Sequence, residues 1–371
     1  MRTPVILAIL SFGMSLHLAG STLRVLSVAT SPESFPEEDR SVIFRDEFDV
    51  PPARNPGYVE HQKGRPQGFT HSPDGGLRGG GMIAVFEKGQ VENGSLKVFF
   101  GRTPAGSRGL RKDETFRNIY WRVYVKHEIG WEGNPAKLGR TTCLMSPDWK
   151  QGFIAHVWGG KDNCLCIDPA TGIVDGNPVT TRYNDFANLK WLGNRHGSIP
   201  VFSSAESGRW VCVESHVRLN YPDKADGIFQ LWVDGKPEAS RHDINWHGNW
   251  DDYAINAVFL ENHWNDGSKK RQSRWFDHFV IRTEPIGPAT AARPVTIERT
   301  LSPGDTPWEV EIAKDPDGKE IVWKSGSSIP AATTTLTVDD KSVPHEQGVT
   351  YWVKIRKTGE AEWSPWHSPF R

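Results

Sequence analysis

The sequence predicts an all-β protein whose main domain is a two-sheet jelly roll. Short runs that alternate between apolar and polar side chains recur along the chain, and Gly, Pro, Asn or Asp bounds each run. No stretch has helical periodicity of useful length, and the 36 glycines suit short strands joined by wide turns. Eight or more such strands over roughly 240 residues favour two packed sheets over alternating β-α-β units.

The main domain is expected to span 40–287. Its predicted strands fall at 42–49, 82–89, 95–102, 119–128, 153–160, 210–220, 228–235, 255–264 and 274–283. A stretch rich in Pro and Ala at 288–294 suits a linker. The remaining segment, 295–371, is predicted to form a small second β-sandwich. Its alternating runs lie at 308–315, 320–326, 334–338 and 351–357.

The N-terminus has the composition of a targeting segment. Arg2 precedes an apolar run that is shorter than the roughly 20 residues of a membrane-spanning helix. Residues 1–29 are therefore assigned to a signal peptide and leader, with cleavage either near Ala19–Ser21 or after Ala29. We expect a protein secreted to the extracellular space or periplasm, without a membrane span.

Composition limits the partners of this chain. Its 44 Lys and Arg residues balance 45 Asp and Glu residues, so the formal charge of −1 gives no overall attraction to nucleic acid. We expect a monomer that binds no nucleic acid and needs no cofactor. The cysteines form one or two disulfides in an oxidising compartment or remain buried free thiols, and they lack zinc-finger spacing. They are Cys143, Cys164, Cys166 and Cys212.

A polar row marks the strand pair within 208–235. One face of its first strand carries Cys212, Glu214, His216 and Arg218, while valines occupy the alternate positions. The valine face predicts a hydrophobic core. The opposite face is either simply solvated or in contact with a polar ligand.

The strand within 119–128 has a second unusual face. Tyr120, Arg122, Tyr124 and Lys126 share it, and Trp121, Val123 and Val125 share the other. Solvation explains the two cations as a surface feature. A groove for an acidic glycan explains them as well, because Arg binds carboxylates and Tyr supplies a stacking ring and a proton.

Four stretches of the chain carry a resemblance to known proteins: 119–131, 208–235, 257–268 and 274–287. They resemble the concanavalin A-like jelly-roll proteins related to polysaccharide lyases, such as glucuronan lyases and jelly-roll alginate lyases. The end of the chain resembles the last three strands of a fibronectin type III module, which would serve as a spacer or attachment unit. The resemblance to the lyase-related jelly rolls implies a carbohydrate-active protein and an acidic polysaccharide as its partner.

Cleavage of a uronate by β-elimination needs three groups. A cation must neutralise the carboxylate, a base must remove the adjacent proton, and an acid must protonate the leaving oxygen. We expect Arg122 to meet the carboxylate with help from Lys126 and Arg218. His216 is the expected base because its ordinary pKa is about 6.5. Tyr124 is the expected acid, and a tyrosine in such a site can also serve as the base.

Five more residues are candidates for substrate contact. Glu214 would orient His216 or offset positive charge, and Gln230 lies on the paired strand. His156 is either a core histidine or a base beside a stacking platform formed by Trp158. Trp250 and Asn262 belong to an aromatic and amide-rich segment that suits a groove wall.

Other functions remain open at this stage. A glycoside hydrolase needs two carboxylates about 5 to 5.5 Å apart, most simply from acidic residues at i and i+4 of a strand, and no such run is present. Hydrolysis therefore ranks third, behind elimination and non-catalytic glycan binding or adhesion. Asp251, Asp252 and Asp277 are considered as oxygen ligands for a structural calcium ion, although their spacing matches no known calcium loop.

Overall fold

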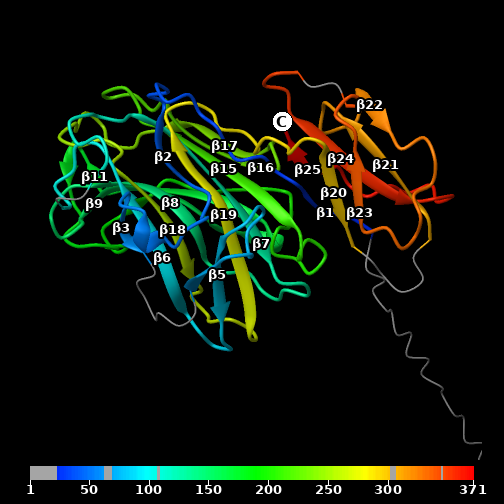
Figure 1. The fold of residues 1–371 in the computed structure, drawn as a ribbon. Coiled ribbons are helices and arrows are strands. Elements are labelled where there is room, and N and C mark those ends of the chain that lie inside the picture. Colours follow the sequence, from blue (N-terminus) through cyan, green and yellow to red (C-terminus); the bar gives the residue numbers. More distant parts are fainter. Residues whose placement is uncertain (1–22, 62–68, 107–108, 301–305, 344–345) are drawn as a thin grey trace, which may run out of the picture.

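The computed structural model describes residues 23–61, 69–106, 109–300, 306–343 and 346–371, and it confirms an all-β protein. A large sandwich of two eight-stranded sheets lies beside a small sandwich (Figure 1). The described part contains two helices, both single 3-10 turns: η1 (Pro52–Arg54) and η2 (Lys161–Asn163).

One sheet of the large sandwich is called the β7 sheet here. Its strands are β2 (Val42–Asp46), β4 (Phe69–Ser72), β5 (Gly81–Phe86), β7 (Asn118–His127), β15 (Trp210–Arg218), β16 (Gly227–Val233), β17 (Lys236–Ile244) and β19 (Gln272–Arg282). They are ordered β17-β16-β15-β7-β19-β5-β4, with β2 also paired to β19, and every pairing is antiparallel.

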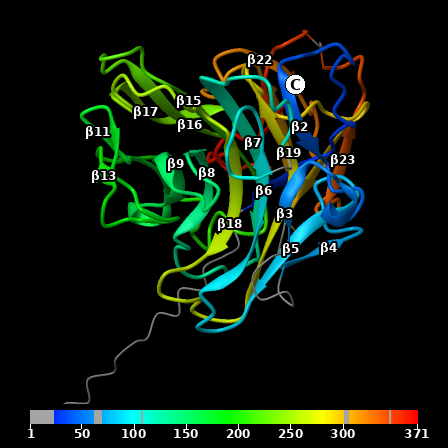
Figure 2. The same cartoon turned by 90° about the vertical axis from the view of Figure 1, so that its left-hand side faces the viewer.

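The facing sheet is called the β8 sheet. Its strands are β3 (Tyr58–His61), β6 (Glu92–Phe99), β8 (Lys137–Leu144), β9 (Gln151–Gly159), β10 (Leu165–Thr171), β13 (Lys190–Trp191), β14 (Arg195–His196) and β18 (Ala257–His263). The order is β13-β10-β9-β8-β18-β6-β3, with β14 also paired to β10. A short ribbon of β11 (Ile173–Val174) and β12 (Asn177–Pro178) lies in the segment between β10 and β13, at one edge of the molecule in Figure 2.

The core of the large sandwich lies between these two sheets. Trp121, Val123 and Val125 of β7 are buried there against residues such as Phe153 and Val157 of β9. Each large apolar side chain buried in this way contributes about 1.5–3 kcal/mol to the free energy of unfolding. The alternation predicted for β7 and β15 is thereby confirmed, and their polar faces point away from the core.

The small sandwich packs a three-stranded sheet on a four-stranded sheet. The strands of the first are β1 (Val25–Val28), β20 (Val295–Arg299) and β23 (Thr335–Val338), in the order β1-β20-β23. The strands of the second are β21 (Trp308–Ala313), β22 (Ile321–Lys324), β24 (Tyr351–Lys357) and β25 (His367–Phe370), in the order β22-β21-β24-β25. Trp308, Val310 and Tyr351 are fully or almost fully buried in its core. A second small β-sandwich is thus present, and its kinship to fibronectin type III modules stays a prediction.

The first strand corrects a predicted boundary. Residues 25–28 were assigned to the leader, but β1 pairs with β20 and places Val25 opposite Arg299 and Val28 opposite Ile297. Both valines are buried. The chain therefore begins its described part in the small sandwich, runs through the large one and then returns. The predicted signal peptide lies mostly within 1–22, outside the described residues.

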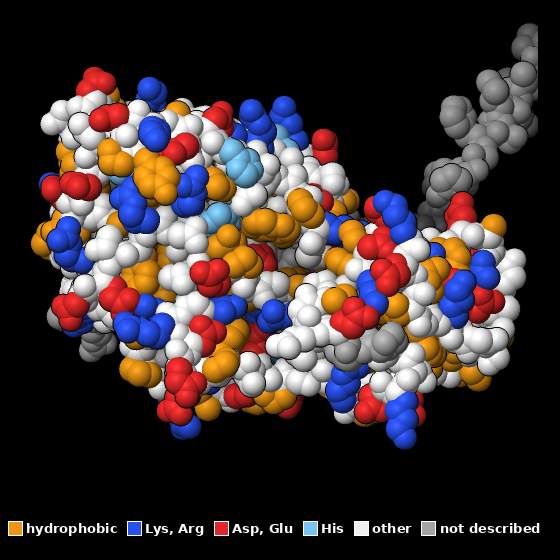
Figure 3. Space-filling view, turned by 90° about the horizontal axis from the view of Figure 1, so that it is seen from above, with side chains coloured by type: hydrophobic (Ala, Val, Ile, Leu, Met, Phe, Trp, Pro, Cys, Tyr) orange, Lys and Arg blue, Asp and Glu red, His pale blue; other side chains and the backbone are white. Residues whose placement is uncertain are grey.

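The segment 288–294 is packed rather than free. The backbone N–H of Ala289 donates to the Tyr124 hydroxyl at 2.9 Å, and that of Ala291 donates to the carbonyl of Arg371 at 2.9 Å. Both alanines are fully buried, so the prediction of a simple linker is wrong here. Figure 3 views the junction of the two sandwiches from above and shows charges of both signs interspersed over that face.

Candidate functional site

The structure brings the two predicted polar strand faces together. In the β7 sheet, β15 pairs with β7 so that Glu214 lies opposite Arg122 and His216 lies opposite Tyr120. These side chains occupy the outer face of the sheet. The N-terminal segment and the segment 284–292 cover much of that face, which gives several of these residues a structural role.

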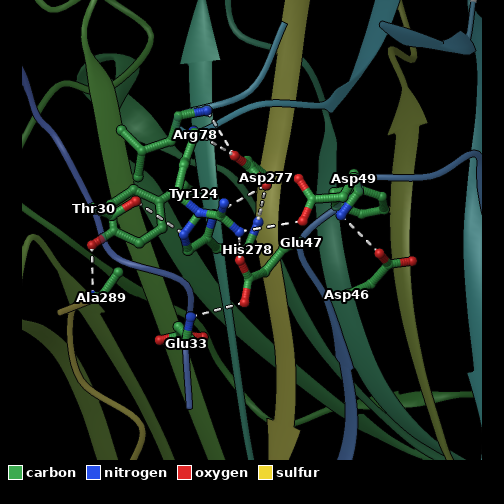
Figure 4. A network of polar contacts seen from close by, with 12 residues as sticks. Thr30, Glu33, Asp46, Glu47, Asp49, Arg78, Tyr124, Asp277, His278 and Ala289 are labelled. Atoms are coloured by element: carbon green, nitrogen blue, oxygen red, sulfur yellow. Dashed lines mark hydrogen bonds and ion pairs between the residues drawn. The ribbon is translucent and has the colours of Figure 1, made fainter. Parts of the chain in front are cut away.

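Arg122 forms a buried ion pair rather than a ligand contact. Its Nη1 and Nη2 atoms lie 2.7 and 2.5 Å from the two carboxylate oxygens of Glu33, and both side chains are almost completely inaccessible. Burial alone would lower the pKa of Arg122, but Glu33 raises it above its ordinary value. Figure 4 shows a polar network that includes Glu33 of this pair, and in which Thr30 and His278 lie within hydrogen-bond distance.

Tyr124 and Glu214 anchor the segment that crosses to the small sandwich. The Tyr124 hydroxyl accepts the bond from Ala289 described above, and the side chain is 5% exposed. The Glu214 carboxylate accepts hydrogen bonds from the backbone of Ile286 at 2.9 Å and Gly287 at 2.8 Å. A substrate would have to displace this segment to reach either group.

His216 is the centre of a small polar cluster. Its Nδ1 lies 2.8 Å from Gln230 Oε1, its Nε2 lies 2.7 Å from Asn118 Oδ1, and its ring stacks on Tyr120 with centroids 4.0 Å apart. Burial lowers the pKa of His216 to about 4, so it is neutral near pH 7. Each ring nitrogen faces an amide side chain at hydrogen-bond distance, so a substrate would have to displace one of these amides to reach the ring.

The remaining predicted contacts are scattered. The Lys126 ammonium lies over the rings of Trp210 and Trp275, and Arg218 donates to the carbonyl of Asp226 at 2.7 Å. Trp250 is 9% exposed and packs in the core. The expectation that Arg122, Tyr124, Glu214 and His216 line one open, concave surface is therefore not met, because a packed segment covers the first three.

An open groove lies instead over the outer face of the β8 sheet. Its volume is about 540 Å³. The residues that line it are Glu60, Glu92, Gly94, Ser95, Lys97, Lys137, Trp158, Tyr183, Asn184, Phe186, Trp191, Glu261, Asn262, His263 and Asn265. Of the predicted substrate contacts, Asn262 is among them, and His156 lies directly beside Trp158 of the lining.

The floor of the groove follows from strand register. Lys97 pairs with Phe259, Phe259 with Arg140, Arg140 with His156, and His156 with Asp168, so one row crosses five strands. Neighbouring positions such as Val98, Val157 and Val258 belong to the core. A register shift between Lys137 and Gly139 lets Lys137 share the outer face with Arg140, although the two residues are three apart.

A loop between β12 and β13 supplies the other wall. The Asp185 carboxylate fixes this loop by accepting bonds from the backbone and hydroxyl of Thr181 and from Asn188, all at 2.8 Å. Asn184 is tied to the sheet because its backbone N–H donates to the side-chain oxygen Oε1 of Gln151 at 2.9 Å. Tyr183 and Asn184 thereby reach Arg140, which donates to the Tyr183 hydroxyl and, at 2.8 Å, to the Asn184 side chain.

Aromatic side chains form one end of the groove. The ring of Trp191 stacks near Trp158, with centroids 5.7 Å apart, and near Phe186, with centroids 6.1 Å apart. Trp191 is 40% exposed and Phe186 is 38% exposed. His156 stacks under Trp158 at 4.2 Å. Such a wall offers flat apolar surface to the faces of sugar rings.

Charged groups gather at the other end. Glu261 lies 2.8 Å from Arg140, and Lys97 lies 2.7 Å from Glu60. Burial alone would raise the pKa of Glu261, but Arg140, Lys137 and Lys97 lower it, so the carboxylate is ionised. Burial lowers the pKa of Lys137, and among the described residues no carboxylate lies within 4 Å of its ammonium.

Several buried polar atoms of the groove lack a protein partner within the described residues. They are both ring nitrogens of His156, both polar side-chain atoms of Asn262 and Oε2 of Glu261. Burial, with the charges of Arg140 and Lys137, holds the pKa of His156 well below 6.5. Because buried polar groups are normally hydrogen-bonded, this concentration favours a polar ligand over this sheet.

The structure also bears on metals, thiols and membranes. Asp251 and Asp252 are exposed, whereas Asp277 is buried in the network of Figure 4, so they do not form the calcium site considered above. Within the described ranges, no cluster of three or more His, Cys, Asp or Glu side chains is placed to hold a metal. No helix in the same ranges has the length and apolar character to cross a bilayer. All four cysteines are buried and unpaired.

Sequence reasoning missed the main groove residues for identifiable reasons. Tyr183 lies in a loop without any periodicity, and Lys137 lies on a strand that the alternation did not reveal. The signal that was available is the His156 and Trp158 pair, for which a core histidine and a base beside a stacking platform were both considered. His156 is completely buried, its ring stacks on Trp158, and its ring nitrogens have no hydrogen-bond partner among the described residues.

Comparisons with known proteins give weak structural likenesses. No protein-family model matches the sequence, and no curated protein matches it. An endo-β-1,4-glucuronan lyase from the fungus Trichoderma reesei is similar with a TM-score of 0.44 and 13% identity, over 66% of this chain and 96% of that one. An alginate lyase from Chlorella virus is similar with a TM-score of 0.39 and 15% identity, over 55% and 84%. A marine alginate lyase from Aplysia kurodai is similar with a TM-score of 0.37 and 12% identity, over 71% of this chain and 99% of that one. None of the three exceeds 15% identity, so the side chains of the groove must carry any assignment of function.

Proposed function

We propose that this chain is a secreted polysaccharide lyase that cleaves a uronate-containing glycan by β-elimination in the groove of the β8 sheet. The observation that carries the proposal is the arrangement of three groups: the Tyr183 phenol, the Arg140 guanidinium that donates to its oxygen, and the unpaired Lys137 ammonium at the same groove. Elimination needs a base and an acid of this kind close to a bound uronate.

Lys137 is the base in this proposal. Burial disfavours its charged form, and without a carboxylate within 4 Å it can reach the neutral amine more readily than a surface lysine. The amine takes the proton from the carbon next to the uronate carboxylate. The electron pair left there forms the double bond while the bond to the glycosidic oxygen breaks.

Tyr183 is the acid. Arg140 donates to the phenol oxygen, so the hydroxyl hydrogen remains available to an acceptor in the groove. Burial raises the pKa of Tyr183 to about 12, which keeps the phenol protonated near neutral pH. It protonates the departing glycosidic oxygen. Lys97 and the amide of Asn262, which has no protein partner, face the uronate carboxylate as charge moves onto it.

Hydrolysis fits the groove less well. Asp168, whose pKa is raised to about 6 by burial, is the best carboxylic acid near the groove. The ionised carboxylate of Glu261 is three strands away in the sheet, or about 14 Å at the usual strand spacing. Glycosidases need their two carboxyl groups about 5 to 9.5 Å apart.

The test is an assay on a panel of polyuronates and glycosaminoglycans that follows the absorbance of unsaturated uronate products. We expect product from at least one polysaccharide. Lys137→Met and Tyr183→Phe should each lower kcat by about 10²–10⁴-fold while glycan binding persists. His216→Gln, on the other sheet, is the matched control and should remain active.

Two outcomes would contradict the proposal. Full activity in both groove variants would exclude Lys137 and Tyr183 as base and acid. Absence of unsaturated product from every polysaccharide, with binding retained, would instead support a non-catalytic glycan-binding protein, for which the exposed aromatic wall of Trp191 and Phe186 is the supporting observation.

A further inference from the structure

The charges along the groove restrict which acidic glycan it can hold. Its lining contains three carboxylates, Glu60, Glu92 and Glu261, against two lysines, Lys97 and Lys137. A polymer made only of uronates carries one negative charge on every sugar, and each charge must find compensation along the groove. Like charges placed next to one another weaken association.

The cations near the groove are already largely compensated by protein. Lys97 lies 2.7 Å from Glu60, and Arg140 lies 2.8 Å from Glu261. His263 lies 3.7 Å from Glu92 at the rim, and burial lowers the pKa of His263, so this histidine adds no cation near neutral pH. These pairs leave little positive charge for ligand carboxylates, and among the described residues Lys137 is the lining lysine that has no carboxylate within 4 Å.

The aromatic end offers a different kind of surface. Trp158, Trp191 and Phe186 present stacked rings, and the Lys137 ammonium lies 5.7 Å from the centroid of the Phe186 ring. A flat apolar wall binds the face of a neutral sugar without any need for charge compensation. The groove thus contains one position lined by charged side chains and a neighbouring position lined by aromatic rings.

We propose that the substrate is a heteropolysaccharide in which a uronate is flanked by neutral sugars, rather than a homopolymer of uronates. The inference rests on the proposed lyase function and adds a substrate class to it. One uronate occupies the position beside Lys97, Lys137 and Tyr183, and a neutral sugar stacks on Trp191. Glu92 at the rim disfavours a second uronate.

The experiment compares two sets of polysaccharides at equal uronate concentration. Hyaluronan and deacylated gellan contain uronates separated by neutral sugars, whereas alginate, glucuronan and pectate contain uronates alone. We expect kcat/KM for the better member of the first set to exceed that for every homopolyuronate by about tenfold or more. Affinity electrophoresis on the same polysaccharides provides a second readout that needs no catalysis.

A charge variant makes the test sharper. Glu92→Gln should raise binding and cleavage of homopolyuronates and so reduce the preference for polysaccharides whose uronates are separated by neutral sugars. Glu320→Gln is the matched control, because its side chain is 64% exposed, pairs with a lysine at 3.0 Å and lies on the small sandwich. This control should leave the preference unchanged.

The outcomes separate the two proposals. Equal or better cleavage or retention of homopolyuronates would overturn the substrate class even if the chain is a lyase. If no polysaccharide yields unsaturated product, the lyase proposal fails. Stronger retention of hyaluronan or gellan would then still support the charge argument, and equal or stronger retention of homopolyuronates would overturn it.

Discussion

Arg122 and Glu33 form a doubly hydrogen-bonded ion pair in the buried junction between the outer face of the β7 sheet and the N-terminal segment. Their atoms meet at 2.7 and 2.5 Å, and the side chains are 0% and 3% exposed. Arg122 Nη1 also donates to the carbonyl of Gly287 at 3.1 Å. One guanidinium thus joins the entering and leaving segments of the large sandwich.

We expect Arg122→Ala to lower the free energy of unfolding by about 3–5 kcal/mol, because it leaves the Glu33 charge buried and unpaired. Denaturant unfolding measures the effect. Arg271→Ala removes an exposed pair with Glu87 and should cost at most about 1 kcal/mol. Replacing Arg122 by Met and Glu33 by Leu together should recover most of the loss. A loss for Arg122→Ala no larger than that of the exposed pair would contradict this role.

The same pair shows how far the sequence could lead. Alternation identified which residues share a face of β7 and β15, and the proposed glycan groove combined these two faces, which the structure pairs in one sheet. Alternation does not reveal what covers a face. The covering segments lie far away in the chain, at Glu33 and at Ile286 to Ala289, and no local pattern links them to Arg122.

The groove was harder to predict for a different reason. Its chemistry depends on a register shift beside Lys137 and on a loop that carries Tyr183, and neither has a periodic signature. His156 and Trp158 were visible because they lie two apart on a regular strand. Strand faces are therefore predictable from this sequence, whereas contacts built by loops and bulges need the fold.

The pH dependence of activity provides a prediction about Lys137. As pH rises, the amine loses its proton and the rate should rise, with a midpoint below 10.5 because burial lowers the pKa of Lys137. The rate should fall again as Tyr183 deprotonates near its pKa of about 12. Since Glu261 raises the pKa of Lys137, Glu261→Gln should move the rising limb to lower pH. A shift to higher pH in the kcat/KM profile would contradict the assignment.

The pH dependence of stability reports on His216. Its pKa is about 4 in the folded chain, below the ordinary value of 6.5, so the unfolded chain binds a proton first as pH falls. This contribution to stability is fully present above pH 6.5 and is lost as pH falls towards 4, by about 3 kcal/mol. His216→Gln should remove that part of the dependence in denaturant unfolding measured across this range. An unchanged dependence in the variant would assign the loss to other groups.

Trp191 tests the aromatic wall independently of catalysis. Trp191→Ala should weaken glycan binding by about 1–2 kcal/mol, since it removes an aromatic stacking surface that is 40% exposed. Isothermal titration with the best polysaccharide measures the change. Trp232→Ala, a half-buried tryptophan on β16 of the other sheet, is the control and should bind as the unaltered chain does. Equal losses in both variants would indicate a general effect on folding.

The first strand decides between the two candidate cleavage sites of the N-terminal segment. Cleavage after Ala29 would remove β1, whose Val25 and Val28 are buried in the small sandwich and which forms one edge of its three-stranded sheet. Cleavage near Ala19–Ser21 keeps the strand. If the predicted signal peptide is cleaved, we therefore expect mass spectrometry of the processed chain to find an N-terminus before Val25. A chain that begins at residue 30 should lose the cooperative thermal unfolding of the small sandwich, whereas one that begins at residue 22 should retain it. Equal unfolding temperatures for the two chains would show that β1 contributes little, and the later cleavage site would then be compatible with the fold.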